Sequence, residues 1–324
     1  GAVFAGNMNA LLFSLMGGVP AMVVMILLSR FRATTFEDLY QGTKAIPWED
    51  YVGREGAFPV KGHSVRSALY SIPDCQKITK KAVVDRLASV YHIARLPESG
   101  PLYQIEFFIL KDEVHLMIDT TGTTLHKRGY RPVSNAAPLR ETLAAGMVKM
   151  SRPRENVLLV DPLCGSGTIA IEAALLTGNI APGLKRSFAA EQFSMLPASV
   201  WQEEREKAKS EIRPWESKIY AYDIDPMCVT MAKENARRAG VEDRIVFRVA
   251  DVRNFRSPEP EARGTIVTNP PYGERIGELK EVENMYRALG ATMKTDTTWS
   301  AYVITSMEYF ESLYGRKADR KRKL

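Results

Sequence analysis

Short apolar runs and segments of helical spacing alternate through the second half of the chain. The apolar runs, each four to seven residues long, fall at residues 157–161, 219–223, 245–249, 265–268 and 299–305. Such alternation is typical of a mainly parallel, doubly wound sheet, in which ligands bind at the carboxyl ends of the strands. We therefore predict an α/β fold with a doubly wound, Rossmann-like domain in the second half.

The first half has a different pattern. Strand-like runs at residues 21–28, 103–110 and 114–120 are interspersed with helix-like segments at 35–41 and 78–95. The last two runs are separated by three polar residues, which predicts an antiparallel hairpin. We predict a smaller α+β domain here, and this half has no visible catalytic constellation.

The two patterns meet at residues 131–138, a stretch with two prolines that is typical of a loop. We place the domain boundary there, with one domain over residues 1–131 and the other over 132–324. A long, charged insertion at residues 185–215 separates the first two strands of the second domain. We expect this insertion to form an extra helix.

The beginning of the chain is unusually apolar. Residues 1–29 contain no charged side chain, and residues 11–28 resemble a membrane span or a signal sequence. Two glycines and a proline interrupt the stretch, and no basic segment precedes it. We therefore predict a helix at residues 8–16 and a buried strand at 21–28, and expect no membrane association. The first residue is Gly1 rather than Met, which indicates an internal start.

Composition narrows the class of protein. The chain has 324 residues, of which 45% are hydrophobic and 25% charged, and this is enough for two globular domains. Its three cysteines and four histidines have neither the pairing of a disulfide framework nor the spacing of a zinc site. We therefore expect a cytoplasmic protein without a structural metal.

The net charge of +6 and the pI near 9.1 suggest a nucleic-acid partner, but the charge is unevenly distributed. Residues 316–323 alone contribute +5, so the rest of the chain carries only +1. A terminal basic run is more often a solvated tail than a binding element. Bulk charge is therefore weak support for RNA binding.

A glycine-containing turn follows the first strand of the second domain and opens a predicted helix at residues 168–176. Glycine lets the backbone approach a ligand closely, and the free amides of a helix start offer donors to anionic groups. The turn lacks the third glycine of a dinucleotide fingerprint and the Gly-Lys-Ser/Thr ending of a P-loop, which disfavours NAD and ATP. A tight turn without a ligand has a similar pattern. The candidate cofactor-binding residues are Asp161, Cys164, Gly165, Ser166, Gly167 and Thr168.

Acidic residues stand at the ends of the next two strands. A carboxylate accepts two hydrogen bonds, so Asp223 is the candidate for holding both hydroxyls of a ribose. Asp225, which precedes Pro226, is better suited to capping the following helix. Asp251 is the candidate acceptor for an adenine amine, although an aspartate there is also a common cap residue. Together with Asp161, these residues favour a nucleoside cofactor.

The fourth strand runs into Asn269, Pro270, Pro271 and Tyr272, the candidate catalytic residues. Two successive prolines stiffen the backbone and remove two amide donors, which leaves carbonyl oxygens free as acceptors. The two hydrogens of an exocyclic base amine could be accepted by the Asn269 amide oxygen and the Pro270 carbonyl. The amine nitrogen would then point toward a methyl donor, and Tyr272 would stack on the extruded base. A proline-rich turn that only closes a strand is the alternative.

Two further features bear on this site. Cys164 could attack a pyrimidine ring and so methylate carbon, but its place inside the glycine turn favours packing. Residues 138–150 are predicted to form a helix, which could equally be an amphipathic packing helix. The first residues of that helix could cover the methionine end of the cofactor: Arg140, Glu141 and Thr142.

Three motifs together resemble the signature of class I methyltransferases that act on amino groups. They lie at residues 161–168, 222–226 and 269–275, and the last resembles the Asn-Pro-Pro-Tyr form. The resemblance implies S-adenosylmethionine as cofactor and S-adenosylhomocysteine as product. Asn269 would then contact both the cofactor and the base.

The first half resembles a THUMP domain, an RNA-binding module, with a partial ferredoxin-like lead-in. The junction at residues 125–131 and 137–143 is similar to that of the bacterial THUMP-containing guanine-N2 methyltransferases of large-subunit ribosomal RNA. The resemblance implies ribosomal RNA, or an assembling large subunit, as the partner. Two departures matter: the family's first strand and helix are missing, and its closing strand would follow Leu324, so we expect an incomplete sheet.

Several functions stay open at this point. Guanine-N2 methylation of ribosomal RNA is the first, with the related reaction on tRNA as its variant. The loop motif is shared with adenine-specific DNA methylases, so adenine-N6 methylation of DNA or RNA is the second. A cofactor-binding RNA module without catalysis is the third, and the intact loop at residues 269–272 disfavours it. Candidate phosphate contacts, which could also be solvated surface residues, are Lys127, Arg128, Arg131, Lys185 and Arg186.

Overall fold

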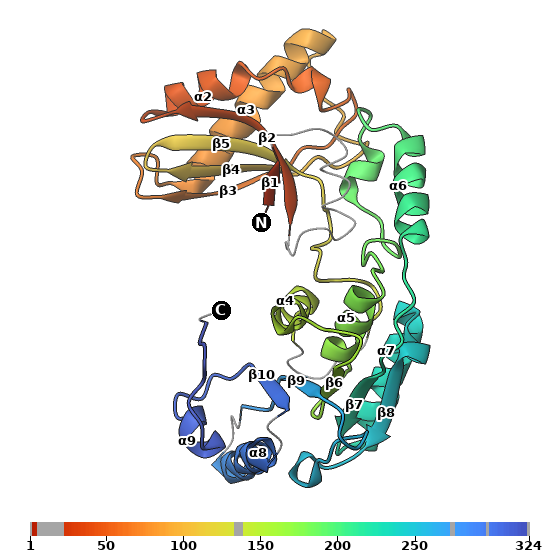
Figure 1. Ribbon diagram of the computed structural model, residues 1–324. Helices are drawn as coiled ribbons and strands as arrows, with labels where there is room; N and C mark the ends of the chain where they lie inside the picture. The colour runs from red at the N-terminus through yellow and green to blue at the C-terminus, as the bar shows by residue number, and fades with distance from the viewer. Residues whose placement is uncertain (1, 5–22, 133–138, 273–275, 296–297, 323–324) are drawn as a thin grey trace. The chain divides into compact units, whose positions relative to one another are not determined.

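The computed structural model describes residues 2–4, 23–132, 139–272, 276–295 and 298–322 (Figure 1). The helix predicted at residues 8–16 therefore lies outside the described residues. Among the helices that the structure describes, none combines the length and the apolar character needed to cross a bilayer.

The chain divides into two compact units. The first unit comprises Gly1–Leu125 and Arg186–Ser210, and the second comprises His126–Lys185 and Glu211–Leu324. This division differs from the boundary expected between residues 131 and 132 in two respects. The junction residues 126–131 pack with the second unit, and most of the insertion packs with the first.

The first unit is built on a five-stranded sheet with helices on one face (Figure 1). Its described elements are β1 (Ala2–Phe4), β2 (Val24–Arg32), α2 (Phe36–Lys44), η2 (Trp48–Asp50), β3 (Val60–Val65), α3 (Ile72–Tyr91), β4 (Ile105–Leu110), β5 (Glu113–Asp119), η3 (Ala189–Gln192) and α6 (Ala198–Ser210). The strand order is β1-β2-β5-β4-β3. The outer pairs of strands are parallel and the inner pairs are antiparallel.

Local sequence signals account for most elements of the first unit. The predicted hairpin is confirmed as β4 and β5, and its tight turn places Lys111 and Asp112 at positive φ. The two predicted helices are confirmed as α2 and α3, with shifted bounds. Helix α2 begins at a capping box, in which Thr35 and Asp38 each accept from the other's backbone N–H.

Strands β2 and β3 of the first unit differ from the sequence prediction. The strand expected at residues 21–28 is found as β2, but only its first residue, Val24, is buried, so the expectation of a buried strand was wrong. Strand β3 was missed because it lacks a strong apolar alternation and contains Gly62, which packs against Phe107 of β4. Its pairing with β4 compensates for the weak local signal.

The insertion forms the extra helix that the sequence predicts, α6, and belongs to the first unit. The Arg186 guanidinium donates to the backbone carbonyls of Thr123 and, at 3.0 Å, Thr124. The ring of Phe193 stacks on Tyr103 with 4.5 Å between centroids. These contacts join the insertion to the first unit, although the residues on either side of it belong to the second.

The second unit is the predicted doubly wound domain. Its described elements are α4 (Glu141–Ser151), β6 (Leu158–Asp161), α5 (Thr168–Thr177), β7 (Ile219–Asp223), α7 (Pro226–Ala239), η4 (Glu242–Arg244), β8 (Ile245–Val249), η5 (Val252–Asn254), β9 (Gly264–Thr268), α8 (Ile276–Thr295), β10 (Trp299–Val303) and α9 (Phe310–Tyr314). The strand order is β10-β9-β6-β7-β8, and every neighbouring pair is parallel. All five predicted strands are confirmed.

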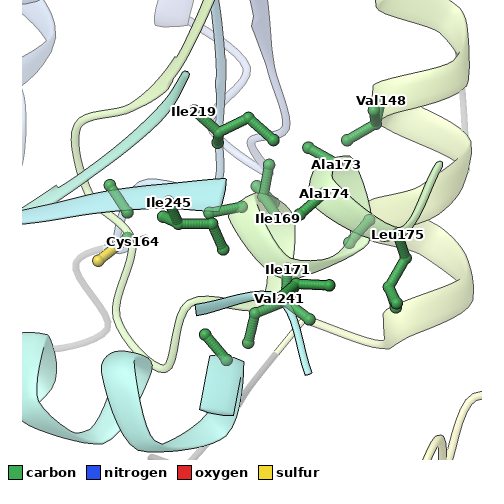
Figure 2. Packing of buried hydrophobic residues seen from close by; sticks show 14 of the residues in the cluster. Val148, Cys164, Ile169, Ile171, Ala173, Ala174, Leu175, Ile219, Val241 and Ile245 are labelled. Carbon is green, nitrogen blue, oxygen red and sulfur yellow. The ribbon is translucent and has the colours of Figure 1, made fainter. Parts of the chain in front are cut away.

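Apolar clusters cover both faces of this sheet. One joins α4, α5 and α7 to the strands, as the packing of Val148 and Ile169 near Ile219 and Ile245 illustrates (Figure 2). The other joins α8 and η5 to the opposite face. Helix α5 is buried nearly all round, which fits its continuous apolar sequence. Its first residue therefore stands fixed at the carboxyl edge of the sheet.

Candidate active site

The glycine turn leads from β6 into α5 and leaves the start of that helix open. Gly165 and Gly167 have φ values of 49° and 81°, which glycine adopts at little cost. Gly167 is the N-cap of α5 and supplies no side chain to its first amides. A Cβ on Gly167 would lie 2.9 Å from the Cβ of Ala232 in α7. The turn therefore needs glycine for both conformation and space, as the sequence predicts.

Backbone contacts join this turn to the end of β7. The Cys164 N–H donates to the carbonyl of Tyr222 at 2.8 Å, and the Gly165 N–H donates to Oδ2 of Asp223 at 2.9 Å. The Cys164 thiol is buried in the apolar cluster (Figure 2), and burial raises its pKa well above the ordinary value. A thiol held protonated in this way is a packing group rather than a nucleophile.

Asp225 has the capping role that the sequence suggested, and Asp223 does not act as this cap. Asp225 caps α7 by accepting from the Met227 N–H at 2.8 Å, ahead of Pro226. Asp223 accepts from Gly165 and, through Oδ1, from the Asp225 N–H at 3.0 Å. A carboxylate has about four acceptor positions, so Asp223 keeps capacity for a ligand. Its role as the ribose ligand stays a prediction.

Asp251 lies after β8 and is engaged with its neighbour. It is the N-cap of η5, and its carboxylate also accepts from the Arg253 side chain at 2.8 and 3.0 Å. This ion pair lowers the pKa of Asp251. Asp251 is therefore a cap residue, which was the alternative interpretation of its sequence position. A contact with adenine stays a prediction, and the adenine amine would then share this carboxylate with Arg253.

Asp161 connects the glycine turn to the catalytic loop. Its side chain is 1% exposed, and Oδ1 accepts from the Thr268 hydroxyl at 2.8 Å and the Leu163 N–H at 3.3 Å. Burial raises its pKa to about 7, and the nearby charge of Asp223 adds to the rise. Thr268 is the residue before Asn269, so Asp161 fixes the point at which the loop leaves β9.

The loop at residues 269–272 combines an exposed aromatic ring with a partly exposed amide. Pro270 is buried, whereas the Tyr272 side chain is 37% exposed. The Tyr272 hydroxyl donates to Oδ1 of Asn269 at 2.6 Å. Burial raises the pKa of Tyr272, which keeps this hydroxyl protonated at neutral pH. The acceptor that the sequence assigned to a base amine is therefore already oriented by its neighbour.

Helix α8 contributes a tyrosine that contacts the same loop. The fully buried Tyr286 hydroxyl donates to the Pro271 carbonyl at 3.4 Å and shares a hydrogen bond with Thr305 at 3.1 Å. Tyr286 was not predicted from the sequence, because its only signal is one tyrosine on an amphipathic helix. Ile224, an apolar residue 55% exposed between Asp223 and Asp225, was not predicted either. An exposed apolar residue directly after the strand-end acid could have been noticed.

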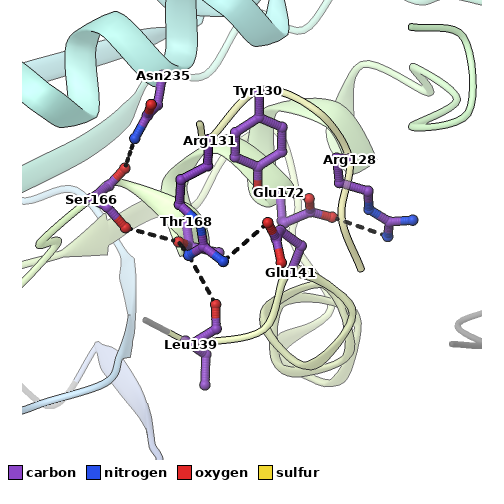
Figure 3. A network of polar contacts seen from close by, with 9 residues as sticks. All are labelled: Arg128, Tyr130, Arg131, Leu139, Glu141, Ser166, Thr168, Glu172 and Asn235. Carbon is purple, nitrogen blue, oxygen red and sulfur yellow. Dashed lines mark hydrogen bonds and ion pairs between the residues drawn. The ribbon is translucent and has the colours of Figure 1, made fainter. Parts of the chain in front are cut away.

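The start of α4 is tied to the glycine turn by buried charges (Figure 3). Glu141 is 4% exposed, and its Oε1 lies 3.0 Å from the Arg131 guanidinium. Arg131 also donates to Thr168 of α5 at 2.7 Å. Arg140 is the N-cap of α4, without a capping side-chain hydrogen bond, and Thr142 is half-buried. These three predicted residues therefore begin a helix beside the turn.

Two predicted phosphate contacts are wrong for the same reason. The side chains of Arg128 and Arg131 are each only 8% exposed. Arg128 lies 3.5 Å from Glu172, which also accepts from Tyr130 at 3.0 Å (Figure 3). A guanidinium buried against a carboxylate presents no net charge to RNA. The sequence could not reveal this, because the acidic partners lie far along the chain.

The remaining predicted phosphate contacts are one arginine, Arg186, and two lysines, Lys127 and Lys185. Arg186 holds loop carbonyls of the first unit and stacks over Phe188, which is a structural role. Lys185 donates to the Arg238 carbonyl at 2.9 Å, at the end of α7. Lys127 and Lys185 are both exposed, so both side chains remain candidates for contact with an RNA phosphate.

The residues at the sheet edge offer matching groups for S-adenosylmethionine. Oε2 of Glu141 has no hydrogen-bond partner among the described residues, although it is buried. An unpaired buried carboxylate oxygen calls for a cationic donor, such as the ammonium group of a methionine moiety. The carboxylate of Asp223 suits a ribose. The open amides at the start of α5 suit the carboxylate of the methionine moiety, and the exposed side chain of Ile224 suits an adenine ring. A hollow of about 770 Å³ between α7 and β8, lined by Lys233 among others, shares none of these residues.

Comparison with known proteins assigns the two halves. Residues 128–324 match the model of the family described as RMKL-like, methyltransferase domain. Residues 33–119 match the model of the THUMP domain.

Two curated relatives extend over most of the chain. It is 45% identical over 307 residues to "Putative RNA methyltransferase YpsC" of Bacillus subtilis (strain 168), covering 93% of this chain and 78% of that protein. It is 34% identical over 279 residues to "Ribosomal RNA large subunit methyltransferase K/L" of Psychromonas ingrahamii (strain DSM 17664 / CCUG 51855 / 37). That match covers 84% of this chain but only 37% of the relative, so the chain spans little more than a third of its length.

Two solved structures share the fold and much of the sequence. One is titled "a predicted N6-adenine-specific DNA methylase from Listeria monocytogenes str. 4b F2365", with a TM-score of 0.93 and 45% identity over 98% of this chain and 84% of that one. The other, "SMU.472, a putative methyltransferase complexed with SAH", has a TM-score of 0.85 and 40% identity over 93% of this chain and 80% of that one. The chain thus belongs to the family of RMKL-like methyltransferase domains, with a THUMP domain in its first half.

Proposed function

We propose that this chain transfers a methyl group from S-adenosylmethionine to the exocyclic N2 amine of a guanine in large-subunit ribosomal RNA. The observation that carries the proposal is the position of the loop at residues 269–272. It leaves β9 directly after Thr268, whose hydroxyl is bonded to Asp161 at the start of the glycine turn. The candidate acceptor for an amine and the candidate cofactor turn therefore share one edge of the sheet.

The cofactor assignment is supported by the groups around the turn and by the structural relative solved with SAH. When bound, S-adenosylmethionine supplies an electrophilic methyl group on a sulfonium sulfur. On this chain, Asp223 would hold the ribose and Oε2 of Glu141 the ammonium group. Asp251 and Ile224 would hold the adenine, one by accepting from its amine and the other by packing on its ring.

The loop would act by positioning and electrostatics. The amide oxygen of Asn269 has two lone pairs, so it can accept from a base amine while Tyr272 still donates to it. The Pro270 carbonyl would accept the second amine hydrogen. Both oxygens would stabilise the positive charge that develops on the nitrogen as its bond to the methyl carbon forms and the bond from that carbon to sulfur breaks. The thioether S-adenosylhomocysteine would be the leaving group, and the methylated nitrogen would release one proton to water. The exposed ring of Tyr272 would stack on the base.

RNA as the substrate rests on the THUMP domain and on the names of the two curated relatives, one of which acts on large-subunit ribosomal RNA. Such a substrate would place the protein in the cytoplasm. Adenine-N6 methylation is the second candidate, because a solved relative carries that description. An amide and a carbonyl acceptor suit the amine of either base, so the loop supports both reactions.

The test uses the purified chain, methyl-labelled S-adenosylmethionine and nucleic acids from a strain that lacks the gene. Ribosomal RNA, tRNA and genomic DNA are incubated separately, digested and analysed by mass spectrometry for labelled nucleosides. We expect labelled N2-methylguanosine in large-subunit ribosomal RNA. Labelled N6-methyladenine in RNA or DNA would favour the second candidate, and label in tRNA alone would replace the ribosomal substrate. Absence of label from all three would argue against catalysis.

A further inference from the structure

Arg131 is the most highly connected side chain beside the glycine turn (Figure 3). Its Nη1 donates to the Leu139 carbonyl at 3.1 Å and to the Thr168 hydroxyl at 2.7 Å. Its Nη2 lies 3.0 Å from Oε1 of Glu141. One guanidinium therefore joins the chain leading into α4, the first turn of α4 and the first residue of α5.

The contacts of Arg131 continue through the turn itself. The Thr168 hydroxyl also shares a hydrogen bond with Ser166 at 3.2 Å. The Ser166 carbonyl accepts from Asn235 of α7 at 3.0 Å, and Asn235 is fully buried. The path from Arg131 to Asn235 thus fixes both sides of the turn against the helices that carry it. The planar, fixed geometry of a guanidinium suits this bridging role better than a lysine ammonium would.

The two carboxylate oxygens of Glu141 have different surroundings. Arg131 binds Oε1, while the buried Oε2 has no partner among the described residues. Burial raises the pKa of Glu141, and the Arg131 charge opposes that rise. The arginine therefore favours the ionised carboxylate and holds it in one orientation, in which Oε2 stays available for a ligand.

We propose that Arg131 is a positioning residue of the cofactor site, which holds Glu141 and Thr168 so that the free oxygen of Glu141 accepts from the ammonium group of S-adenosylmethionine. The inference rests on the proposed function, because it takes that cofactor as the ligand. It gives the junction between the THUMP domain and the methyltransferase domain a role in binding cofactor rather than RNA.

Arg128 provides a matched control. Its side chain is as buried as that of Arg131 and is also paired with a glutamate, Glu172. That glutamate lies in the middle of α5 rather than at the turn. Arg128→Met therefore measures what the loss of a buried guanidinium does to the fold alone.

The experiment measures the dissociation constant for S-adenosylhomocysteine by calorimetry and the Tm of each variant. We expect Arg131→Met to weaken binding at least about tenfold, since truncating one partner of a buried charge pair is costly. Arg131→Lys should recover part of this loss. Arg128→Met should lower the Tm and change the dissociation constant much less than Arg131→Met does, because its partner Glu172 lies in the middle of α5 rather than at the turn.

A double-mutant cycle separates positioning from general damage. If Arg131 acts through Glu141, Arg131→Met should weaken binding much less in a Glu141→Gln background than in the wild type. If Arg131→Met alone fails to fold, Arg131→Lys takes its place in the cycle, because a lysine keeps the positive charge opposite Glu141 but not the planar guanidinium. Equal affinity of folded Arg131→Met and wild type, or full additivity in the cycle, would overturn the inference and leave the proposed function standing. Failure of the wild type to bind S-adenosylhomocysteine would remove the proposed cofactor and this inference together.

Discussion

The amide of Asn269 is held in place before any base arrives. Tyr272 donates to Oδ1 at 2.6 Å, and Tyr286 donates to the carbonyl of the intervening Pro271. A preorganised acceptor does not have to reorganise as charge develops on the nitrogen, which is where electrostatic catalysis gains most. At the scale of residues, the loop is therefore built to present one oxygen in one direction.

Replacing Asn269 by alanine removes that oxygen without touching the first unit. We expect Asn269→Ala to lower kcat by at least about a hundredfold, as the loss of a single oriented group in a transition state does. RNA affinity, measured by filter binding, should stay within a factor of two or three. Loss of both together would mean that the loop has been misassigned.

Tyr272 combines two roles that substitution can separate. Tyr272→Phe keeps the ring and loses the hydrogen bond to Asn269, so we expect about a fivefold fall in kcat with KM for RNA unchanged. Tyr272→Ala loses the stacking surface as well, and KM for RNA should rise. Steady-state kinetics on the two variants check this, and an unchanged KM in Tyr272→Ala would contradict stacking.

Asp161 predicts a pH dependence of stability. Its pKa is raised from 3.8 to about 7 in the fold, so the unfolded chain loses this proton first as the pH rises. The stabilising contribution is therefore complete below pH 4 and is lost as the pH rises through 7. Asp161→Asn keeps the acceptor for Thr268 but cannot ionise.

Between pH 5 and pH 8, the wild type should lose about 2–3 kcal/mol of unfolding free energy relative to Asp161→Asn. Chemical denaturation of both proteins at four pH values across this range measures the difference. Parallel stability curves would show that the carboxyl of Asp161 ionises normally in the folded protein.

At the scale of elements, two helices hold the two functional loops. Helix α5 begins directly after Gly167 and is buried against α4, α7 and the sheet, while Tyr286 of α8 contacts the catalytic loop. Helix α7 packs directly against Gly167 of the glycine turn. The geometry of the site therefore depends on helix packing as well as on the motif residues.

Gly167→Ala tests that dependence. The added methyl would meet Ala232 at 2.9 Å in a residue with a φ of 81°, so we expect a loss of roughly 2–4 kcal/mol. This corresponds to a fall in Tm of roughly 5–15 °C, with weaker binding of S-adenosylhomocysteine. Gly146→Ala in α4 is the control, since nothing lies within 4 Å of its added methyl. That variant should be as stable as the wild type or slightly more so.

At the scale of the whole molecule, the chain consists of two compact units. Phe193, brought in by the insertion, stacks on Tyr103 in the first unit, whereas the candidate cofactor residues all lie in the second. A ligand that binds one folded unit stabilises that unit by mass action.

Calorimetric melting should therefore separate the two units. Phe193→Ala should lower one transition, by about 3–5 kcal/mol of unfolding free energy. S-adenosylhomocysteine at a hundred times its dissociation constant should raise the other by about 2.7 kcal/mol. A shift of both transitions by either change would contradict this division of the chain.

Much of the fold could be predicted because its signals are local. The five strands of the second unit are short apolar runs, and the hairpin and α2 carry their own turn and cap residues. Strand β3 escaped prediction because its stability comes from pairing with β4, which follows some forty residues later. The candidate acids and the catalytic loop were predictable for a similar reason, since each directly follows a recognisable strand.

The sequence by itself determined the doubly wound domain, the order of its motifs and the chemistry that an Asn-Pro-Pro-Tyr loop supports. Only the tertiary structure decided what the basic residues of the junction do. Arg128 meets Glu172 across 44 residues of chain, and Arg131 meets Thr168 across 37. Whether an arginine faces RNA or a buried carboxylate depends on where the distant partner is carried by the fold. Charge and spacing along the chain contain no such information, because burial is a property of packed elements.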